Sequence, residues 1–103
     1  MKHKRQKPEV RKESIVKVAL RLAGETHYTQ VQRKQIADEL GVTPPALTYH
    51  FGTMPQLQRA IIRAAIGKED LVVLAQGLVA QDEHAKKAPE ALRRRAIELA
   101  VGV

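Results

Sequence analysis

The chain has no cysteine and almost no aromatic residues: two tyrosines, one phenylalanine and no tryptophan among 103 residues. The absence of cysteine excludes a disulfide framework and a thiolate metal site. The scarcity of aromatics leaves Leu, Ile, Val and Ala to build the core, which favours packed helices. The longest apolar run, Leu71 to Ala75, is far shorter than the roughly 20 residues of a membrane span. The basic N-terminus also lacks the apolar segment of a signal peptide. We therefore expect a single cytoplasmic domain with no membrane partner.

Positive charge is concentrated in the first third of the chain. The net charge is +7, and residues 1–34 account for all of it, with ten lysines and arginines against three glutamates. The remaining 69 residues hold eight basic and eight acidic side chains. This distribution predicts an oriented positive surface for a polyanion such as nucleic acid. The alternative interpretation is a solvated, soluble tail.

The hydrophobic spacing predicts six helices and no strand. Residues 1–8 are expected to form a disordered basic arm that ends at Pro8. The first helix carries apolar residues at Ile15, Val18, Ala19 and Leu22. Gly24 is placed to end this helix.

Capping signals delimit the next helices. Thr29 and Gln32 form a T-x-x-Q capping box, which predicts the start of a second helix that Gly41 stops. A third, short helix covers about 44–50. Thr53 and Gln56 form another capping box at the start of the fourth helix.

The last third of the chain predicts two further helices. Gly67 is placed to end the fourth helix, and Asp70 precedes an apolar fifth helix, "LVVLAQGLVAQ". The segment "EHAKKAP" is expected to be a loop. The last helix is expected to start at Pro89 or a neighbouring residue.

A helix-turn-helix spacing begins at Arg33. The positions that define it are Ile36 and Leu40 on the buried face, Ala37 where the helices cross, Gly41 in the turn, Val42 beneath it and Leu47 as the anchor of the second helix. The turn requires a positive φ that glycine adopts without strain. Because the pattern fixes residue size and polarity at many offsets at once, it is a strong signal for DNA binding.

Two consecutive prolines fit the start of the second helix of this pair. The first four N–H groups of a helix have no partner within it, so Pro44 and Pro45 forfeit no helical hydrogen bond. Pro44 also restricts Thr43 to the extended region that an N-cap requires. The sequence therefore predicts a rigid, well-defined start, and a recognition helix presents this end to base edges.

The segment "RKQIADELGVTPPALTYHFGTMPQL" resembles the DNA-binding domain of the TetR family of transcriptional repressors. The resemblance spans about Glu13 to Ile66. The positions that match directly are Ile36, Ala37, Gly41, Val42, Thr43, Leu47, His50, Phe51 and Leu57. Two positions depart from the family pattern, because Thr48 replaces a common tyrosine and Met54 a common lysine. Both family residues usually help to hold phosphates, so Tyr49, His50 and the basic arm would take over part of that contact.

The part that follows the fourth helix is short for this family, about 36 residues. Two helices can form a dimer bundle, but we do not expect them also to enclose a ligand pocket of several hundred Å³. We therefore expect no small-molecule effector. The chain divides into a basic arm (1–12), a helix-turn-helix domain (13–66) and a helical dimerisation region (67–103).

These features predict an all-α, homodimeric repressor that binds an inverted-repeat operator in double-stranded DNA. The predicted DNA contacts are Lys2, Lys4, Arg5, Lys7, Gln32, Arg33, Lys34, Thr43, Pro44, Ala46, Thr48, Tyr49 and His50. The predicted dimer contacts are Leu74, Leu78, Leu92 and Leu99.

The sequence offers no pattern for catalysis or for a cofactor. His3, His27 and His84 lack metal-ligand spacing, and no nucleophile–base pair, Gly-rich phosphate loop or close carboxylate pair is present. We therefore expect neither an enzyme nor a metal site. The rival hypothesis is a protein-binding module, such as an antitoxin or antirepressor, whose partner binds the apolar C-terminal helices.

Overall fold

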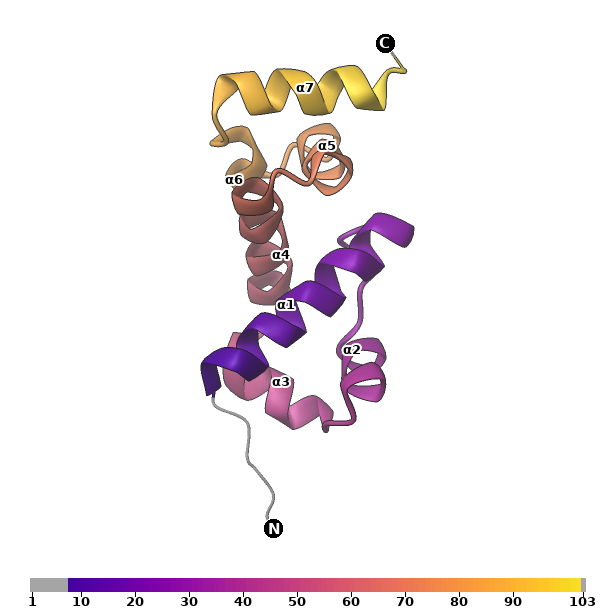
Figure 1. Cartoon of the computed structure of the whole chain (residues 1–103), viewed down its shortest axis with the longest axis vertical. Coiled ribbons are helices and arrows are strands. Elements are labelled where there is room, and N and C mark those ends of the chain that lie inside the picture. The colour runs from indigo at the N-terminus through magenta and orange to yellow at the C-terminus, as the bar shows by residue number, and fades with distance from the viewer. Residues whose placement is uncertain (1–7, 103) are drawn as a thin grey trace.

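The computed structural model describes residues 8–102, and every regular element in this range is a helix. The helices are α1 (Pro8–Glu25), α2 (Arg33–Leu40), α3 (Pro44–Phe51), α4 (Met54–Lys68), α5 (Leu71–Val79), α6 (Glu83–Lys86) and α7 (Glu90–Ala100). In Figure 1, α2 and α3 lie at one end of the molecule and α7 lies at the other, with α1 and α4 between them. The predicted all-α fold is confirmed.

The first helix is longer than its apolar spacing indicated. Pro8 opens α1 instead of ending a disordered arm, and the helix passes Gly24 to end at Glu25. Proline suits the first helical position because its missing N–H has no acceptor there. The predicted arm residues Lys2, Lys4, Arg5 and Lys7 lie outside the described residues.

The predicted capping box of Thr29 and Gln32 is wrong. The N-cap of α2 is Gln32 itself, in extended conformation at φ −114°, and its N–H donates to the side chain of Gln35 at 2.8 Å. Thr29 is used differently, because its hydroxyl lies 2.8 Å from Nδ1 of His27 in the preceding turn. A capping motif fixes a helix start only where the backbone enters the extended region, and here that occurs three residues later.

The end of α4 differs from the prediction, whereas the predicted start of α5 after Asp70 is confirmed. Helix α4 does not end at Gly67 but continues to Lys68, and Glu69 adopts the left-handed conformation at φ 56°. The Asp70 N–H then closes the helix by donating to the Ala65 carbonyl at 2.8 Å. The Asp70 carboxylate in turn accepts a hydrogen bond from the Val73 N–H and caps α5.

The segment expected to be a loop contains the one-turn helix α6. Asp82 caps it, because its carboxylate accepts hydrogen bonds from the backbone N–H groups of His84 and Ala85. Ala85 is fully buried. A Cβ atom at Gly77 would lie only 2.8 Å from the Cβ of Ala85, so the glycine inside α5 permits α6 to pack closely.

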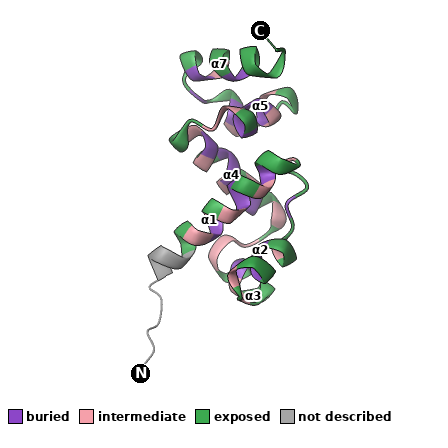
Figure 2. Ribbon diagram, turned by 45° about the vertical axis from the view of Figure 1, so that its right-hand side comes forward, coloured by how far each residue is buried: buried purple, intermediate pink, exposed green. Residues whose placement is uncertain are grey.

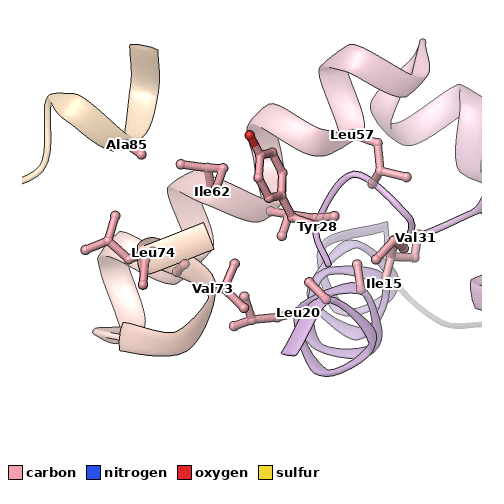
Figure 3. Close-up of a cluster of buried hydrophobic side chains, with 14 of the residues drawn as sticks. Ile15, Leu20, Tyr28, Val31, Leu57, Ile62, Val73, Leu74 and Ala85 are labelled. Atoms are coloured by element: carbon pink, nitrogen blue, oxygen red, sulfur yellow. The ribbon is translucent and has the colours of Figure 1, made fainter. Parts of the chain in front are cut away.

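A single aliphatic core connects the helices, as the composition implies. Ile15, Ile36 and Ile61 are each at most 1% exposed, and Tyr28 is the only aromatic side chain among the buried residues in the described range. Figure 2 shows the buried positions along the inner faces of α1, α4 and α5. In the close-up of Figure 3, buried side chains of α1, α4 and α5 and of the loop after α1 point toward one another.

Within residues 8–102, no helix combines the length and the apolar character that crossing a bilayer requires.

Candidate nucleic-acid interface

Helices α2 and α3 form a helix-turn-helix whose turn depends on Gly41. Gly41 is left-handed at φ 70°, as predicted, and the next N–H, that of Val42, donates to the Ala37 carbonyl at 3.0 Å. Ala37 is fully buried where the two helices meet. Thr43 is extended at φ −92°, and Pro44 is the first residue of α3. The double proline therefore starts α3 as the sequence predicts, although the Thr43 side chain makes no capping hydrogen bond.

Helix α3 has one buried and one exposed face. Leu47 is 1% exposed and anchors the helix, whereas Tyr49, two residues later, is 86% exposed. Among the predicted contacts on this helix and its N-cap, Thr43, Pro44 and Thr48 are exposed, and Ala46 and His50 are half-buried. The rings of Tyr49 and His50 meet edge to face, with their centroids 5.4 Å apart. The exposed face thus carries short polar and apolar groups and one large aromatic hydroxyl.

The three predicted contacts at the start of α2 have different surroundings. Gln32 and Lys34 are exposed, and Lys34 forms an ion pair with Asp38 at 2.9 Å. An exposed pair of this kind contributes little stability, so Lys34 remains available to another anion. Arg33 is half-buried, and its Nη1 donates a hydrogen bond to the Gly52 carbonyl at 3.1 Å.

Part of the positive charge of the first third is neutralised within the chain. The guanidinium of Arg21 pairs with the carboxylates of Glu25 and Glu39 and thereby joins α1 to α2. Hydrogen bonds to Glu39 and then Glu25 raise the pKa of Arg21 above its ordinary value. Arg21 is therefore a structural cation of the described region rather than a free one.

Lys12 is a cation that sequence reasoning did not assign to the site. Its Nζ lies 5.9 Å from the ring centroid of Phe51, the last residue of α3. This contact places a charge of α1 beside the C-terminal end of the exposed helix. In the sequence, only the concentration of positive charge in residues 1–34 points to Lys12. That feature does not distinguish Lys12 from the neighbouring basic residues.

Burial corrects two of the four predicted dimer contacts. Leu74 is fully buried and Leu92 is 6% exposed, so both belong to the core of the single chain and cannot meet a second copy. Helix α5 packs against α7, α4, α6 and α1, and Leu74 and Leu92 both belong to the resulting core. Leu78 is half-buried, and Leu99 is 49% exposed.

A set of apolar side chains that shares only Leu99 with the predicted contacts reaches the surface on α5, on α7 and at the residue after α7. The exposed ones are Val72, Val79, Ile97, Leu99 and Val101. An open groove of about 420 Å³ lies beside them, and we call it the C-terminal groove; it is lined by His27, Val72, Ala75, Gln76, Val79, Leu99 and Ala100. The groove is mostly apolar.

A polar side chain ties α5 to the end of α1. The amide of Gln76 donates to the Ala23 carbonyl at 2.8 Å and accepts from the Tyr28 N–H at 2.9 Å. The Tyr28 hydroxyl lies 3.5 Å from a carboxylate oxygen of Asp82. Burial, and then the negative charge of Asp82, raise the pKa of Tyr28 above its ordinary value. These contacts connect the helix-turn-helix region to the C-terminal helices.

Comparison with known proteins identifies the region that contains this site. The family model described as "Bacterial regulatory proteins, tetR family" matches residues 15–61, which include all of α2 and α3. The HTH-type transcriptional regulator BetI of Rhizobium meliloti (strain 1021) is 37% identical over 59 residues, which are 57% of this chain and 29% of that protein. The matched segment thus spans under a third of the relative's length. No solved structure gives a significant match. The matched residues include the helix-turn-helix described above, and this part of the chain is similar to the DNA-binding region of tetR-family regulatory proteins.

Proposed function

We propose that the chain is a sequence-specific DNA-binding transcriptional repressor that acts as a homodimer on an inverted-repeat operator. The observation that carries the proposal is the exposed face of α3, where Tyr49 is 86% exposed while Leu47 is buried beneath it. A helix of this kind, supported from behind by its partner helix, can enter the major groove of DNA. The name of the relative describes a transcriptional regulator as well.

The residues on this face determine how bases are read. Pro44, Ala46 and the methyl group of Thr48 contact thymine methyl groups, while the hydroxyls of Thr48 and Tyr49 bond base edges or phosphates. None of these side chains can form the bidentate pair that arginine makes with guanine. The preferred half-site is therefore read largely through thymine methyl groups.

Selection of bound sequences from a random duplex pool tests the proposal. An enriched inverted repeat is expected, with half-sites one helical turn apart, roughly 34 Å. Enrichment of a single half-site would contradict the proposal that the chain binds DNA as a homodimer. The absence of any enrichment would overturn sequence-specific binding.

The exposed apolar side chains of α5 and α7 support the homodimer. Val79 is 71% exposed and Leu99 is 49% exposed, and both line the C-terminal groove. A second copy packed there would remove these side chains from water. Light scattering at micromolar concentration should give twice the chain mass for the parent protein and the chain mass for a Val79→Asp, Leu99→Asp variant. Glu98→Gln, on the same helix, is the control that should remain dimeric.

The basic arm is proposed to contact phosphates or a minor groove. Each phosphate contact contributes about 0.9 to the slope of log affinity against log salt concentration. Removing residues 1–7 should weaken all DNA sequences alike and flatten that slope. An unchanged slope would make the arm a solubility segment.

The C-terminal groove favours a second candidate function, a protein-binding module. Its apolar lining could equally receive a helix of another protein. Salt-sensitive DNA affinity of the isolated chain distinguishes the two, because a protein-binding module would show none.

A further inference from the structure

The turn between α3 and α4 is held by a residue from the far end of α2. Arg33 is the first residue of α2, and its guanidinium donates to the carbonyl of Gly52, directly after α3. The chain connects the two helices at the turn around Gly41, so the start of α2 and the end of α3 lie away from that turn and form the open side of the pair. We propose, building on the DNA-binding function above, that Arg33 is a positioning residue that closes this open side and sets the angle of the recognition helix, and is not itself a phosphate contact.

The acceptor of this hydrogen bond is fixed in place. Gly52 has φ 75° and ψ −128°, a conformation that strongly favours glycine. A Cβ atom there would lie 2.0 Å from Oε1 of Gln56. The same oxygen accepts the Thr53 N–H at 2.8 Å, and the Gly52 N–H donates to the Thr48 carbonyl at 2.7 Å. The carbonyl that Arg33 binds therefore belongs to a turn that is hydrogen-bonded to both α3 and α4.

The surroundings of Arg33 distinguish it from its neighbours. Gln32 and Lys34 are exposed, whereas Arg33 is half-buried and directed into the protein. A cation that serves phosphates needs no such fixed acceptor. Thr48 and Tyr49, the proposed base contacts, lie within four residues of Gly52. A change in the tilt of the end of α3 would consequently displace both of them.

The inference predicts a loss of specificity without a loss of charge neutralisation. Arg33→Met keeps the apolar stem and removes the donor, and Arg33→Lys keeps the charge but replaces the planar guanidinium with a shorter ammonium group. Both variants should bind the selected operator about tenfold more weakly, the scale of one hydrogen bond to a charged group. Binding to a random duplex and the slope of log affinity against log salt should equal those of the parent. Arg63→Met, which removes an exposed arginine of α4, is the control for charge loss alone.

The opposite pattern would overturn the inference. A phosphate contact would be preserved in Arg33→Lys, and Arg33→Met would weaken both duplexes and reduce the slope by about 0.9 per bound chain. Hydrogen exchange of the free protein gives a test that needs no DNA. The Gly52 amide should exchange faster in Arg33→Met and Arg33→Lys than in Arg63→Met, at unchanged secondary structure. Unchanged exchange would refute the inference even if the operator is found, and faster exchange without any selected operator would refute only the proposed function.

Discussion

The N-terminal region, α1–α4, and the C-terminal region, α5–α7, form their turns in different ways. In the first, the left-handed positions at the ends of α2 and α3 are Gly41 and Gly52, at φ 70° and 75°. At the border of the second and within it, Glu69 and Gln81 occupy the left-handed region at φ 56° and 62°. A residue with a Cβ is strained there by roughly 1–2 kcal/mol. Local sequence therefore specifies the turns of the helix-turn-helix, whereas the turns before α5 and α6 form at residues with no intrinsic preference for this conformation.

The two regions also differ in what they expose. Among residues 12–70, Tyr49 is the only exposed large apolar side chain, whereas α5, α7 and the residue that follows carry five. An isolated aromatic on a small polar face is suited to reading a groove, and a cluster of aliphatic side chains is suited to a protein contact. The exposed surface of the N-terminal region thus suits the proposed contact with a DNA groove, and that of the C-terminal region suits the proposed contact with a protein.

The largest expected effect tests the division of α3 into two faces. Leu47→Ala should lower the free energy of unfolding by about 2–5 kcal/mol, because a fully buried leucine leaves a cavity. Tyr49→Ala, two residues away on the exposed face, should change it by no more than about 0.5 kcal/mol. Urea denaturation of the free protein measures both. Equal destabilisation by the two variants would contradict the assignment of the faces.

The second effect concerns binding rather than folding. Thr48→Ala and Tyr49→Ala should each weaken operator binding by about 1–3 kcal/mol, the scale of one good base contact. Titration of labelled operator at fixed salt gives the affinities, and unchanged circular dichroism serves as the control. Two variants that bind like the parent protein would mean that the recognition surface lies elsewhere.

A third variant tests close packing in the C-terminal region. Gly77→Ala should destabilise by about 1–2 kcal/mol, because the added methyl group overlaps Ala85 and Ile62 and outweighs the gain in helix propensity. Gly67→Ala, at an open position of α4, should instead stabilise by about 0.5–1 kcal/mol. Thermal unfolding of the pair gives the comparison. Stabilisation by both substitutions would show that α5 and α6 are not in close contact.

Relief of strain in the C-terminal region should have a smaller effect. Gln81→Gly should raise the free energy of unfolding by about 0.5–1 kcal/mol, because the strain of the left-handed residue exceeds the added entropy of the unfolded chain. The complementary change Gly41→Ala should lower it, since Gly41 requires the same conformation. Urea midpoints of these two variants should therefore move in opposite directions.

The smallest expected effect is a change in stability that occurs only at alkaline pH. Since burial raises the pKa of Tyr28, its proton leaves the unfolded chain first, at about pH 10. The contribution of protonated Tyr28 to the free energy of unfolding is complete below about pH 10. It is lost as the pH rises through the higher pKa of Tyr28 in the folded state. Urea midpoints should therefore fall less steeply above pH 10 in Tyr28→Phe than in the parent protein. In a Tyr49→Phe background only Tyr28 absorbs as a phenolate, so its titration can be followed directly.

The helix-turn-helix could be predicted because neighbouring residues determine it. The positive φ at Gly41, the start at Pro44 and the capping box of Thr53 and Gln56 all depend on local backbone conformation, and the structure contains all three. The buried position of Leu47 follows from the same spacing.

The rest could not be predicted, because local hydrogen bonds compete or because contacts distant in sequence decide. Thr29 and Gln32 fit a capping box, but Thr29 bonds His27, only two positions away, and the sequence does not show which of the two local contacts forms. Leu74 lies on a helix that is apolar around most of its circumference, so the sequence does not show which apolar side chains the neighbouring helices bury. The bond from Arg33 to Gly52 spans 19 positions, and no periodicity signals it.

The position of α7 at the end of the molecule opposite α2 and α3 has a mechanical consequence (Figure 1). In the proposed dimer, the two chains meet at the C-terminal groove, and each recognition helix lies at the end of its chain farthest from that contact. Displacement grows with distance from a pivot, so a small rotation at that joint moves each recognition helix by a much larger amount. Adjacent base pairs are about 3.4 Å apart along the DNA axis. The stiffness of the joint, rather than the chemistry of α3, would then determine how strictly the operator must keep its half-sites in register.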